Sequence, residues 1–577
     1  MIRLTELKLP LDHTPEDLSA LVHTTLGVAA SDIAQWKIFK RSYDARKVTL
    51  LVVYIVDVAL HSADAEAASL SKYAANQHIF AAPDMGYQRV AQACSHLTHR
   101  PVVVGFGPCG IFAALLLAQM GFKPIVLERG KKVRERTKDT WGLWRKNVLN
   151  AESNVQFGEG GAGTFSDGKL WSQIKDPRHL GRKVMQEFVN AGAPEDILIE
   201  SHPHIGTFKL VKVVENMREQ IIALGGEIRF EQRVSDVLLE AQTHDTQGRT
   251  QQIRALTVLD VVANATYELR ADHVVLALGH SARDTFAMLY ERGVYMEAKP
   301  FSIGFRIEHP QGLIDRARWG RHAGHPLLGA AEYKLVHHVE NGVGQGRSVY
   351  SFCMCPGGTV VAATSEPGRV VTNGMSQYSR NERNANAGIV VGIDPRDYPV
   401  DAASFHAAFG DTVNPENRTT DAQHPLSGIV LQRQLESNAY VMGGNTYEAP
   451  GQLVGDFLVD RASGSLGSVV PSYKPGVKLG NLSAALPDYA IAAIRDAIPQ
   501  FAKKIKGFDM PDAVLTGVET RTSSPLRITR SEDFQNLNVA GLYPAGEGAS
   551  YAGGILSAGV DGIKVAEALA KDALANR

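Results

Sequence analysis

The clearest indication of the fold of this chain is the stretch Pro101-Val-Val-Val-Gly105-Phe-Gly107-Pro-Cys-Gly110. Its three valines predict a short buried strand, and the pattern G-x-G-x-x-G follows directly. Residues 111–120 are apolar and form helices readily, and Gly121 stands where a glycine commonly ends a helix. A second predicted strand, over residues 124–127, leads to Glu128. The stretch therefore predicts a strand, a tight turn, a helix and a second strand, the opening unit of a parallel α/β sheet.

Each residue of this unit suits the binding of a dinucleotide. Gly105 permits the tight turn, Gly107 lets the backbone approach a pyrophosphate, and Gly110 lets the helix pack closely on the strand. The amino end of the helix, at Pro108, offers unpaired N–H groups to phosphates. Glu128, 18 residues after Gly110, is placed to accept hydrogen bonds from ribose hydroxyls. We therefore predict a dinucleotide site at these five residues.

Three further stretches bear on which dinucleotide is bound. The sequences Glu128-Arg129-Gly130, HVVLALG (273–279) and LYPAGEGASYAGGI (542–555) resemble flavoproteins of the glutathione-reductase-like superfamily. That resemblance implies FAD rather than NAD, with an acid after the last strand binding the ribitol. Glu547 stands in the place of the commoner Asp, so its side chain is longer. The cofactor-binding residues that this resemblance adds are Arg129, Val234, Gly279, Gly546, Glu547, Gly553, Gly554 and Ile555.

A second match to G-x-G-x-x-G lies at residues 158–163. The residues before it make a poor strand and those after it make a poor helix, so we reject it as a second dinucleotide turn. We expect instead a loop that wraps the FAD, with Gly160, Gly161, Gly163, Thr164 and Ser166 near the cofactor. No dedicated NAD(P)H domain is then expected. NAD(P)H remains possible as a transient electron donor, docking briefly or through another domain.

Several stretches point to a narrower family. They are GEGGAGTFSDGKL (158–170), HPHIGTFKL (202–210), LALGHSARD (276–284), YSFCMCPGGTVV (350–361), TRTSSPLRI (520–528) and PAGEGASYAGGI (544–555). Together they resemble a family of bacterial FAD-dependent dehydrogenase-like proteins, and the resemblance extends over essentially the whole chain. Phe208 departs from the family, which commonly has Asp at this place. The resemblance implies the fold and FAD, but it names no substrate.

The pattern along the chain predicts an α/β protein built from a three-layer Rossmann-type FAD-binding domain and two further domains. Residues 1–95 are expected to form a small α+β domain, in which the polar segment KRSYDARK (40–47) is interpreted as an exposed loop in preference to a contact surface. Residues 96–300 and 511–577 are expected to form the FAD-binding domain. Residues 301–510 are expected to form an inserted, strand-rich α+β substrate domain. Its first strand, residues 301–308, alternates apolar and polar side chains, which predicts a half-buried strand.

Composition excludes several classes of function. The chain has 577 residues and a net charge of -1, so nothing draws it generally to nucleic acid or anionic lipid. Its amino end lacks the pattern of a secretory signal, and no apolar run is long enough to span a membrane. Four cysteines make no disulfide framework and no metal site. We therefore expect a protein of the reducing cytoplasm that acts on a small-molecule substrate.

Cys353 and Cys355 are the first candidates for chemistry. Residues two apart on a strand share a face, so both thiols would lie together while Met354 points away. Pro356-Gly357-Gly358 is then expected to turn the chain. The pair could line the substrate cavity, as redox partners of the flavin or as a polarizable wall. Alternatively, it is a pair of buried, inert thiols.

His280, Arg306 and Arg521 complete the catalytic candidates. His280 follows Gly279 at a predicted strand end, which places it near the cofactor as a candidate acid or base. Arg306 and Arg521 could bind a substrate carboxylate or the flavin O2. Structural ion pairs are the alternative for both arginines.

Three functions remain open at this point. The leading hypothesis is an FAD-dependent dehydrogenase or reductase that acts on a small organic substrate and holds its FAD non-covalently. The first alternative is a flavin-dependent monooxygenase. The second is an FAD-containing redox or partner-binding protein whose domain over residues 1–95 contacts a partner or another subunit.

Overall fold

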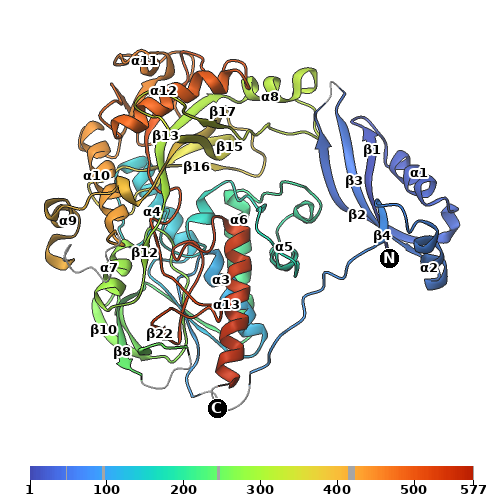
Figure 1. Cartoon of the computed structure of the whole chain (residues 1–577), viewed down its shortest axis with the longest axis horizontal. Helices are drawn as coiled ribbons and strands as arrows, with labels where there is room; N and C mark the ends of the chain where they lie inside the picture. Colours follow the sequence, from blue (N-terminus) through green and yellow to red (C-terminus); the bar gives the residue numbers. More distant parts are fainter. Residues whose placement is uncertain (47–48, 94–97, 243–246, 414–422, 576–577) are drawn as a thin grey trace.

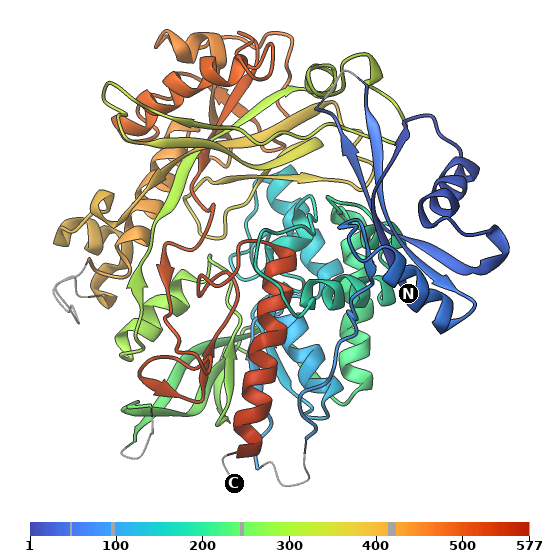
Figure 2. The same cartoon turned by 45° about the vertical axis from the view of Figure 1, so that its right-hand side comes forward.

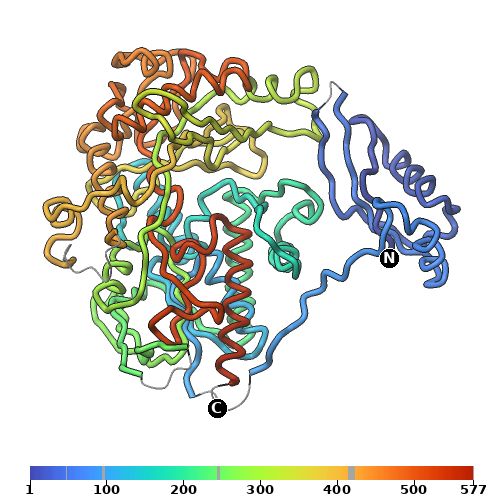
Figure 3. Tube along the Cα trace, in the orientation of Figure 1, coloured from blue at the N-terminus to red at the C-terminus, as the bar shows by residue number. Residues whose placement is uncertain are grey.

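The computed structural model describes residues 1–46, 49–93, 98–242, 247–413 and 423–575. Figure 1 shows a large body and a smaller amino-terminal unit to its side, joined by residues 82–93, which run without helix or strand (Figure 3). Lys47 and the expected domain boundary near residue 95 lie outside the described residues. No described helix combines the length and the apolar character needed to cross a membrane.

A five-stranded parallel sheet forms the lower part of the body. Its order in space is β23-β11-β5-β6-β7, so the first strand of the sheet, β5, lies between the second and the fourth. The order of the strands along the chain reverses between β5 and β11, and ligands bind at such switch points. The bounds are β5 (Val102–Val104), β6 (Ile125–Glu128), β7 (Glu227–Phe230), β11 (Val274–Leu276) and β23 (Leu542–Pro544).

Different layers cover the two faces of this sheet. Val103, Val126 and Val275 pack on one face against helices, while their strand neighbours pack on the other against an antiparallel meander. Alternating side chains thus serve two apolar cores. The helices are α3 (Pro108–Gln119), α5 (Leu180–Asn190), α6 (Thr207–Ala223) and α13 (Ile555–Ala575); the meander is β8 (Gln232–Ala241), β9 (Gln251–Asp260) and β10 (Ala265–Arg270), with β22 (Val539–Ala540) on β9.

The last helix, α13, begins at Ile555 and includes Gly559 and Gly562, although glycine is unfavourable inside a helix. These glycines serve packing, because a Cβ on Gly562 would lie 2.3 Å from the carbonyl oxygen of Cys109 in α3. The pattern that looks like a helix breaker is therefore what lets α13 pack closely on α3.

The upper part of the body is a mostly antiparallel eight-stranded sheet in the order β14-β15-β17-β13-β20-β18-β19, with β16 on β15. Figure 1 shows α12 above it and α4 below it. Its strands are β13 (Phe301–Pro310), β14 (Val336–His338), β15 (Ser348–Ala362), β16 (Thr372–Ser376), β17 (Asn384–Ile393), β18 (Ala449–Leu453), β19 (Val477–Leu479) and β20 (Val514–Glu519). Helices around it include α4 (Val133–Lys146), α8 (Gln311–Trp319), α10 (Ser427–Met442), α11 (Val454–Leu458) and α12 (Asp488–Ala502). α7 (Arg283–Glu291) packs instead on β8 of the lower meander, and α9 (Ala402–Phe409) packs on α10.

Two predictions about this sheet are wrong. Residues 301–309 are all buried, because β13 lies centrally between β17 and β20 and is covered on both faces. Its polar side chains are therefore inside the protein rather than in water. Residues 356–358 make no turn; β15 continues through them with a break in its pairing to β17.

The amino-terminal unit is a four-stranded antiparallel sheet with two helices on its outer face (Figure 2). Its β-α-β-β-α-β order is ferredoxin-like. The elements are β1 (Ile2–Pro10), α1 (Pro15–Leu26), β2 (Ile33–Asp44), β3 (Leu51–Leu60), α2 (Ala63–Lys72) and β4 (Ile79–Ala81). The prediction of an exposed loop from residue 40 is wrong, because residues 40–44 belong to β2 and Arg41 bridges to Glu200 of the body.

Candidate functional site

The glycine turn after β5 lies at the switch point of the parallel sheet. Gly105 has φ +99°, and a Cβ there would lie 2.5 Å from the carbonyl oxygen of Ala277, which follows β11. A Cβ on Gly110 would lie 1.9 Å from the carbonyl oxygen of Gly105. Side chains at either position would push the turn, the helix α3 and the end of β11 apart. The turn therefore requires glycine for close approach, as the sequence predicts.

Glu128 joins three loops at this edge of the sheet. Its carboxylate accepts hydrogen bonds from the backbone N–H groups of Phe106, Gly130 and Gly158, each at 2.9 Å. The side chain is only 5% exposed, so its charge is balanced by these peptide dipoles. Its contact with a ribose hydroxyl stays a prediction.

The second glycine loop folds onto the first. Gly160 donates its N–H to the carbonyl oxygen of Phe106 at 2.8 Å, and a Cβ on Gly161 would lie 2.8 Å from the Cα of Gly107. Only a short 3₁₀ helix, Ala162–Phe165, follows it, so it opens no second strand–turn–helix unit. The loop is in position to cover what the first turn binds. Its predicted cofactor contacts, including those of Gly163, Thr164 and Ser166, remain predictions.

Arg136 holds this second loop in place, and no motif marks it in the sequence. The side chain is fully buried in α4 and donates to the carbonyl oxygens of Asn154, Val155 and Glu159, each at 2.7 Å. A buried guanidinium satisfies several loop carbonyls at once. Arg129 acts nearby, donating to Glu152 and, through two bonds, to Asp284.

The loop after β23 meets the loop after β11. A Cβ on Gly548 would lie 2.2 Å from the carbonyl oxygen of Leu278. By contrast, Cβ atoms on Gly279, Gly553 and Gly554 would meet no heavy atom of the described residues within 4 Å. These three glycines therefore border open space at the same edge of the sheet. Together with the glycine turn and the α3 amino end, this backbone-lined space fits an extended dinucleotide such as FAD.

Glu547 and His280 face each other across this space. The His280 Nε2 lies 3.9 Å from the Glu547 Oε1, and its Nδ1 lies 3.1 Å from the Ser281 hydroxyl. Burial and the nearby charges of Arg521 and Arg283 lower the pKa of His280 to about 3, so the ring is neutral at pH 7.

Glu547 is the group of this pair that titrates near neutrality. Burial raises its pKa to about 7, although the charge of Lys299 opposes the rise. Lys299, whose own pKa burial lowers, is a site residue that the sequence reasoning missed. It lies in an ordinary polar segment just before β13, where no motif marks it. The two pKa shifts therefore favour Glu547 over His280 as the group that exchanges a proton near pH 7.

Behind His280 lies a buried cluster of charges. Glu436 accepts two hydrogen bonds from Arg521, at 2.9 and 2.8 Å, and is paired with Arg283 at 2.8 Å. Arg283 and Glu436 are fully buried. Arg521 also donates to the hydroxyls of Ser281 and Ser365. Arg521 therefore forms the structural ion pair that was the alternative interpretation of this residue. Its contact with a substrate remains a prediction.

Arg306 is likewise part of a buried network. Its guanidinium donates to both carboxylate oxygens of Glu519, to the side chains of Asn373 and Asn386, and to the carbonyl oxygen of Cys353. All five N–H donors are thus engaged. In this arrangement Arg306 fixes the backbone at Cys353 and has no donor left for a substrate.

Cys353 and Cys355 lie at irregularities of β15. The pairing of β15 with β17 shifts between Phe352 and Cys355, and Cys353 has φ +45°. The simple alternation predicted for this strand therefore does not hold, and Met354 is buried too. Cys355 is fully buried and Cys353 is half-buried.

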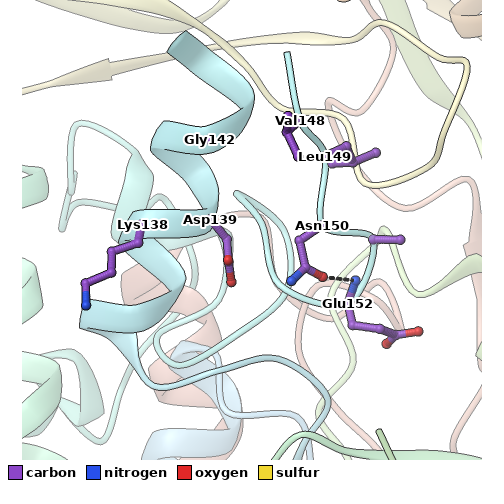
Figure 4. Close-up of a pocket in the computed structure, with 8 residues that line it drawn as sticks. Lys138, Asp139, Gly142, Val148, Leu149, Asn150 and Glu152 are labelled. Carbon is purple, nitrogen blue, oxygen red and sulfur yellow. Dashed lines mark hydrogen bonds between the residues drawn. The ribbon is translucent and has the colours of Figure 1, made fainter. Parts of the chain in front are cut away.

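A separate open pocket of about 560 Å³ lies between α4 and residues 148–152 (Figure 4). Lys138 and Asp139 of α4 line it, together with Asn150, which accepts a hydrogen bond from the backbone N–H of Glu152. Glu152 connects this pocket to Arg129, next to Glu128. None of its lining residues was a predicted site residue.

Comparison with known proteins gives matches over most of the chain. Residues 300–522 match the family described as FAD-dependent protein, C-terminal domain-like, and residues 1–59 match a domain family of unknown function (DUF8436). An uncharacterized protein of Clostridium beijerinckii is 44% identical over 567 residues, which cover 98% of both chains.

Solved structures give only distant likenesses. A geranylgeranyl bacteriochlorophyll reductase-like protein of Thermoplasma acidophilum is 12% identical, with a TM-score of 0.33 and coverage of 82% of this chain and 79% of that one. The glycerol-3-phosphate dehydrogenase of Bacillus halodurans, complexed with FAD, is 13% identical, with a TM-score of 0.24 and coverage of 53% and 49%. Neither score is high enough to carry an argument about this chain.

Proposed function

The chain belongs to the same protein family as the Clostridium beijerinckii relative, and we propose, from its match to an FAD-dependent family over residues 300–522, that it is an FAD-dependent oxidoreductase. More narrowly, we propose a dehydrogenase or reductase that acts on a small organic substrate. The observation that carries the proposal is the contact of Gly105 with the end of β11. It places a glycine turn at the switch point of a parallel sheet, in a chain that also matches an FAD-dependent family.

The residues around this turn would each hold a different part of FAD. The amino end of α3, with Gly107, would face the pyrophosphate, and Glu128 would face the adenosine ribose. The loop from Gly546 to Gly554 would hold the flavin half. Bound FAD supplies the redox chemistry of the reaction.

The protein's own contribution to the reaction would be a proton at Glu547. With a pKa of about 7, this carboxyl can hold or release a proton at neutral pH, whereas neutral His280 can only share a hydrogen bond. Lys299 would favour the ionised form of Glu547. NAD(P)H as a transient donor and a cytoplasmic setting belong to the same proposal.

The proposal is tested on the purified protein. We expect a yellow protein that releases FAD on denaturation, identified by chromatography and mass spectrometry. Anaerobic mixing with NADH or NADPH then asks whether either one bleaches the bound flavin. A colourless protein that does not take up added FAD would contradict the proposal.

The monooxygenase alternative is separated by rapid mixing of the reduced protein with oxygen. A dehydrogenase or reductase reoxidises without hydroxylating an added substrate. A hydroxylated product would favour the monooxygenase.

A further inference from the structure

The break in β15 brings the thiols of Cys353 and Cys355 together. The positive φ of Cys353 and the shifted pairing to β17 bend the strand at this point. The Cys355 thiol donates a hydrogen bond to the Cys353 carbonyl oxygen at 3.3 Å, so the two residues contact each other across the bend. Two neighbouring thiols on a bent strand are a different arrangement from two separate core cysteines.

Two glycines make room for the Cys355 side chain. A Cβ on Gly374 of β16 would lie 2.9 Å from the Cys355 Sγ and 2.7 Å from the Arg306 Nη1. A Cβ on Gly358 would lie 3.2 Å from the Cys355 Cβ. Cys355 is therefore held between two glycines, whereas Cys353 is half-buried and is the more exposed residue of the pair.

The charges around the pair treat the two thiols differently. A hydrogen bond from Cys355 and the positive charges of Arg306 and Lys169 lower the pKa of Cys353. Its hydrogen bond to Cys353 and its burial raise the pKa of Cys355. The thiolate is the reactive form of cysteine, so Cys353 is the nucleophile and Cys355 its partner. Other charged groups that act on the pair are Asp167, which opposes the lowering at Cys353, and Glu519 and Glu547, whose pKa values the Cys353 charge raises.

We propose that Cys353 and Cys355 form a redox-active dithiol that exchanges with small-molecule disulfides. The Cys353 thiolate attacks one sulfur of the disulfide, the S–S bond breaks, and one thiolate leaves. The Cys355 thiol then gives its proton to the departed thiolate and attacks the Cys353 sulfur of the mixed disulfide, and the second thiolate leaves. The pair loses two electrons and the small disulfide gains two, so the protein ends with a Cys353–Cys355 disulfide.

Such a disulfide would be easy to reduce again. Residues two apart in a strand make a strained bridge, and strained disulfides have the more oxidising potentials. The pair therefore suits a cycle rather than a permanent bridge. Its electrostatic contact with Glu547 places it beside the proposed cofactor space, but the exchange itself does not depend on the proposed function.

The test uses the purified full-length protein with its cofactor, equilibrated in glutathione buffers from fully reduced to fully oxidised. Free thiols are then alkylated, and the peptide spanning residues 348–369 is weighed by mass spectrometry. We expect two alkyl groups under reducing conditions and an internal disulfide under oxidising ones. Unchanged double alkylation at every glutathione ratio would overturn the proposal.

Two variants assign the roles. In Cys355→Ala, which removes the hydrogen-bond donor, the mixed disulfide with glutathione should accumulate on Cys353, and alkylation of Cys353 at pH 7 should slow by about tenfold as its thiolate fraction falls. In Cys353→Ser no glutathione should attach to Cys355. Met354→Leu, which keeps both thiols and the buried volume, is the matched control and should behave as the unaltered protein. Glutathione attached to Cys355 in Cys353→Ser would contradict the roles assigned here.

Discussion

The two large sheets position their polar groups by opposite means. The parallel sheet uses backbone: glycine turns in close contact, peptide N–H groups around Glu128, and the amino end of α3. The eight-stranded sheet and its helices use side-chain charges: Arg306 with Glu519, and Arg283 and Arg521 with Glu436. The glycines and the acid of the backbone-made site can be recognised in short stretches of sequence, although they meet backbone from distant segments. A site made from charges depends on partners far apart in the chain.

The largest effect is expected from Gly110→Ala, which tests the site made from backbone. The added Cβ would lie 1.9 Å from the carbonyl oxygen of Gly105, and neither backbone can move without opening the turn. We expect loss of bound FAD and a fall in the free energy of unfolding of about 3 kcal/mol or more. Flavin absorbance per protein and urea unfolding measure the two effects.

Gly464→Ala is the matched control, because a Cβ there meets no heavy atom of the described residues within 4 Å. It should keep both the cofactor and the stability. A Gly110→Ala protein that retains its full FAD content would show that the turn is not the site.

The buried charge cluster is tested by Glu436→Gln. This change leaves Arg283 and Arg521 buried without a carboxylate between them, which costs about 3–5 kcal/mol of unfolding free energy. Glu240→Gln, at a pair exposed to water with Arg254, should cost less than about 1 kcal/mol. Chemical denaturation of both variants gives the comparison, and equal losses would mean that burial does not distinguish the two pairs.

Glu547 lies in the glycine loop after β23, and its pKa responds to the charge of Lys299, just before β13. Its folded pKa, about 7, exceeds the ordinary 4.5, so between these pH values the folded state holds a proton that the unfolded state has released. The free energy of unfolding contributed by this group therefore falls as pH rises from about 4.5 to 7, by about 1–2 kcal/mol for a partly exposed side chain. We expect Glu547→Gln to remove this fall.

The measurement is urea unfolding of cofactor-free protein from pH 5 to pH 8. The stability difference between Glu547→Gln and the unaltered protein should grow with pH. Glu297→Gln, an exposed carboxylate at the start of β12 (Glu297–Ala298), is the control and should follow the unaltered protein. A pH-independent difference for Glu547→Gln would argue against the raised pKa.

The smallest effect lies outside both sheets, at Arg41→Ala. Arg41 pairs with Glu200, but backbone hydrogen bonds from Arg41 to Ile199 and from Ser201 to Arg41 remain without the side chain. We expect a loss of only about 0.5–1 kcal/mol in the docking of the amino-terminal unit. Faster proteolysis within residues 82–93 would report it, and Arg46→Ala, which removes an exposed pair with Asp44, should leave the rate unchanged.

The same contrast explains what the sequence could and could not predict. Three features follow from neighbours in sequence, and the structure agrees with them: the turn at Gly105, the end of α3 before Gly121, and the rejection of the second glycine motif as a second dinucleotide turn. The burial of β13 was missed because Arg306 looks like a solvent-facing residue until Glu519, 213 residues away, is placed against it. Lys299 was missed for the same reason. The bend in β15 needs the pairing with β17, which no local pattern shows.

The position of β23 and α13 has a consequence for biosynthesis. The glycine turn at residues 105–110 is made early, yet the sheet around it is completed by a strand at residues 542–544 and by the helix that ends the described chain. A ribosome that has finished the first half of the protein has therefore made only part of the proposed cofactor site. If this site binds FAD as proposed, binding must wait until β23 and α13 have been added, and a premature stop before β23 leaves the site incomplete.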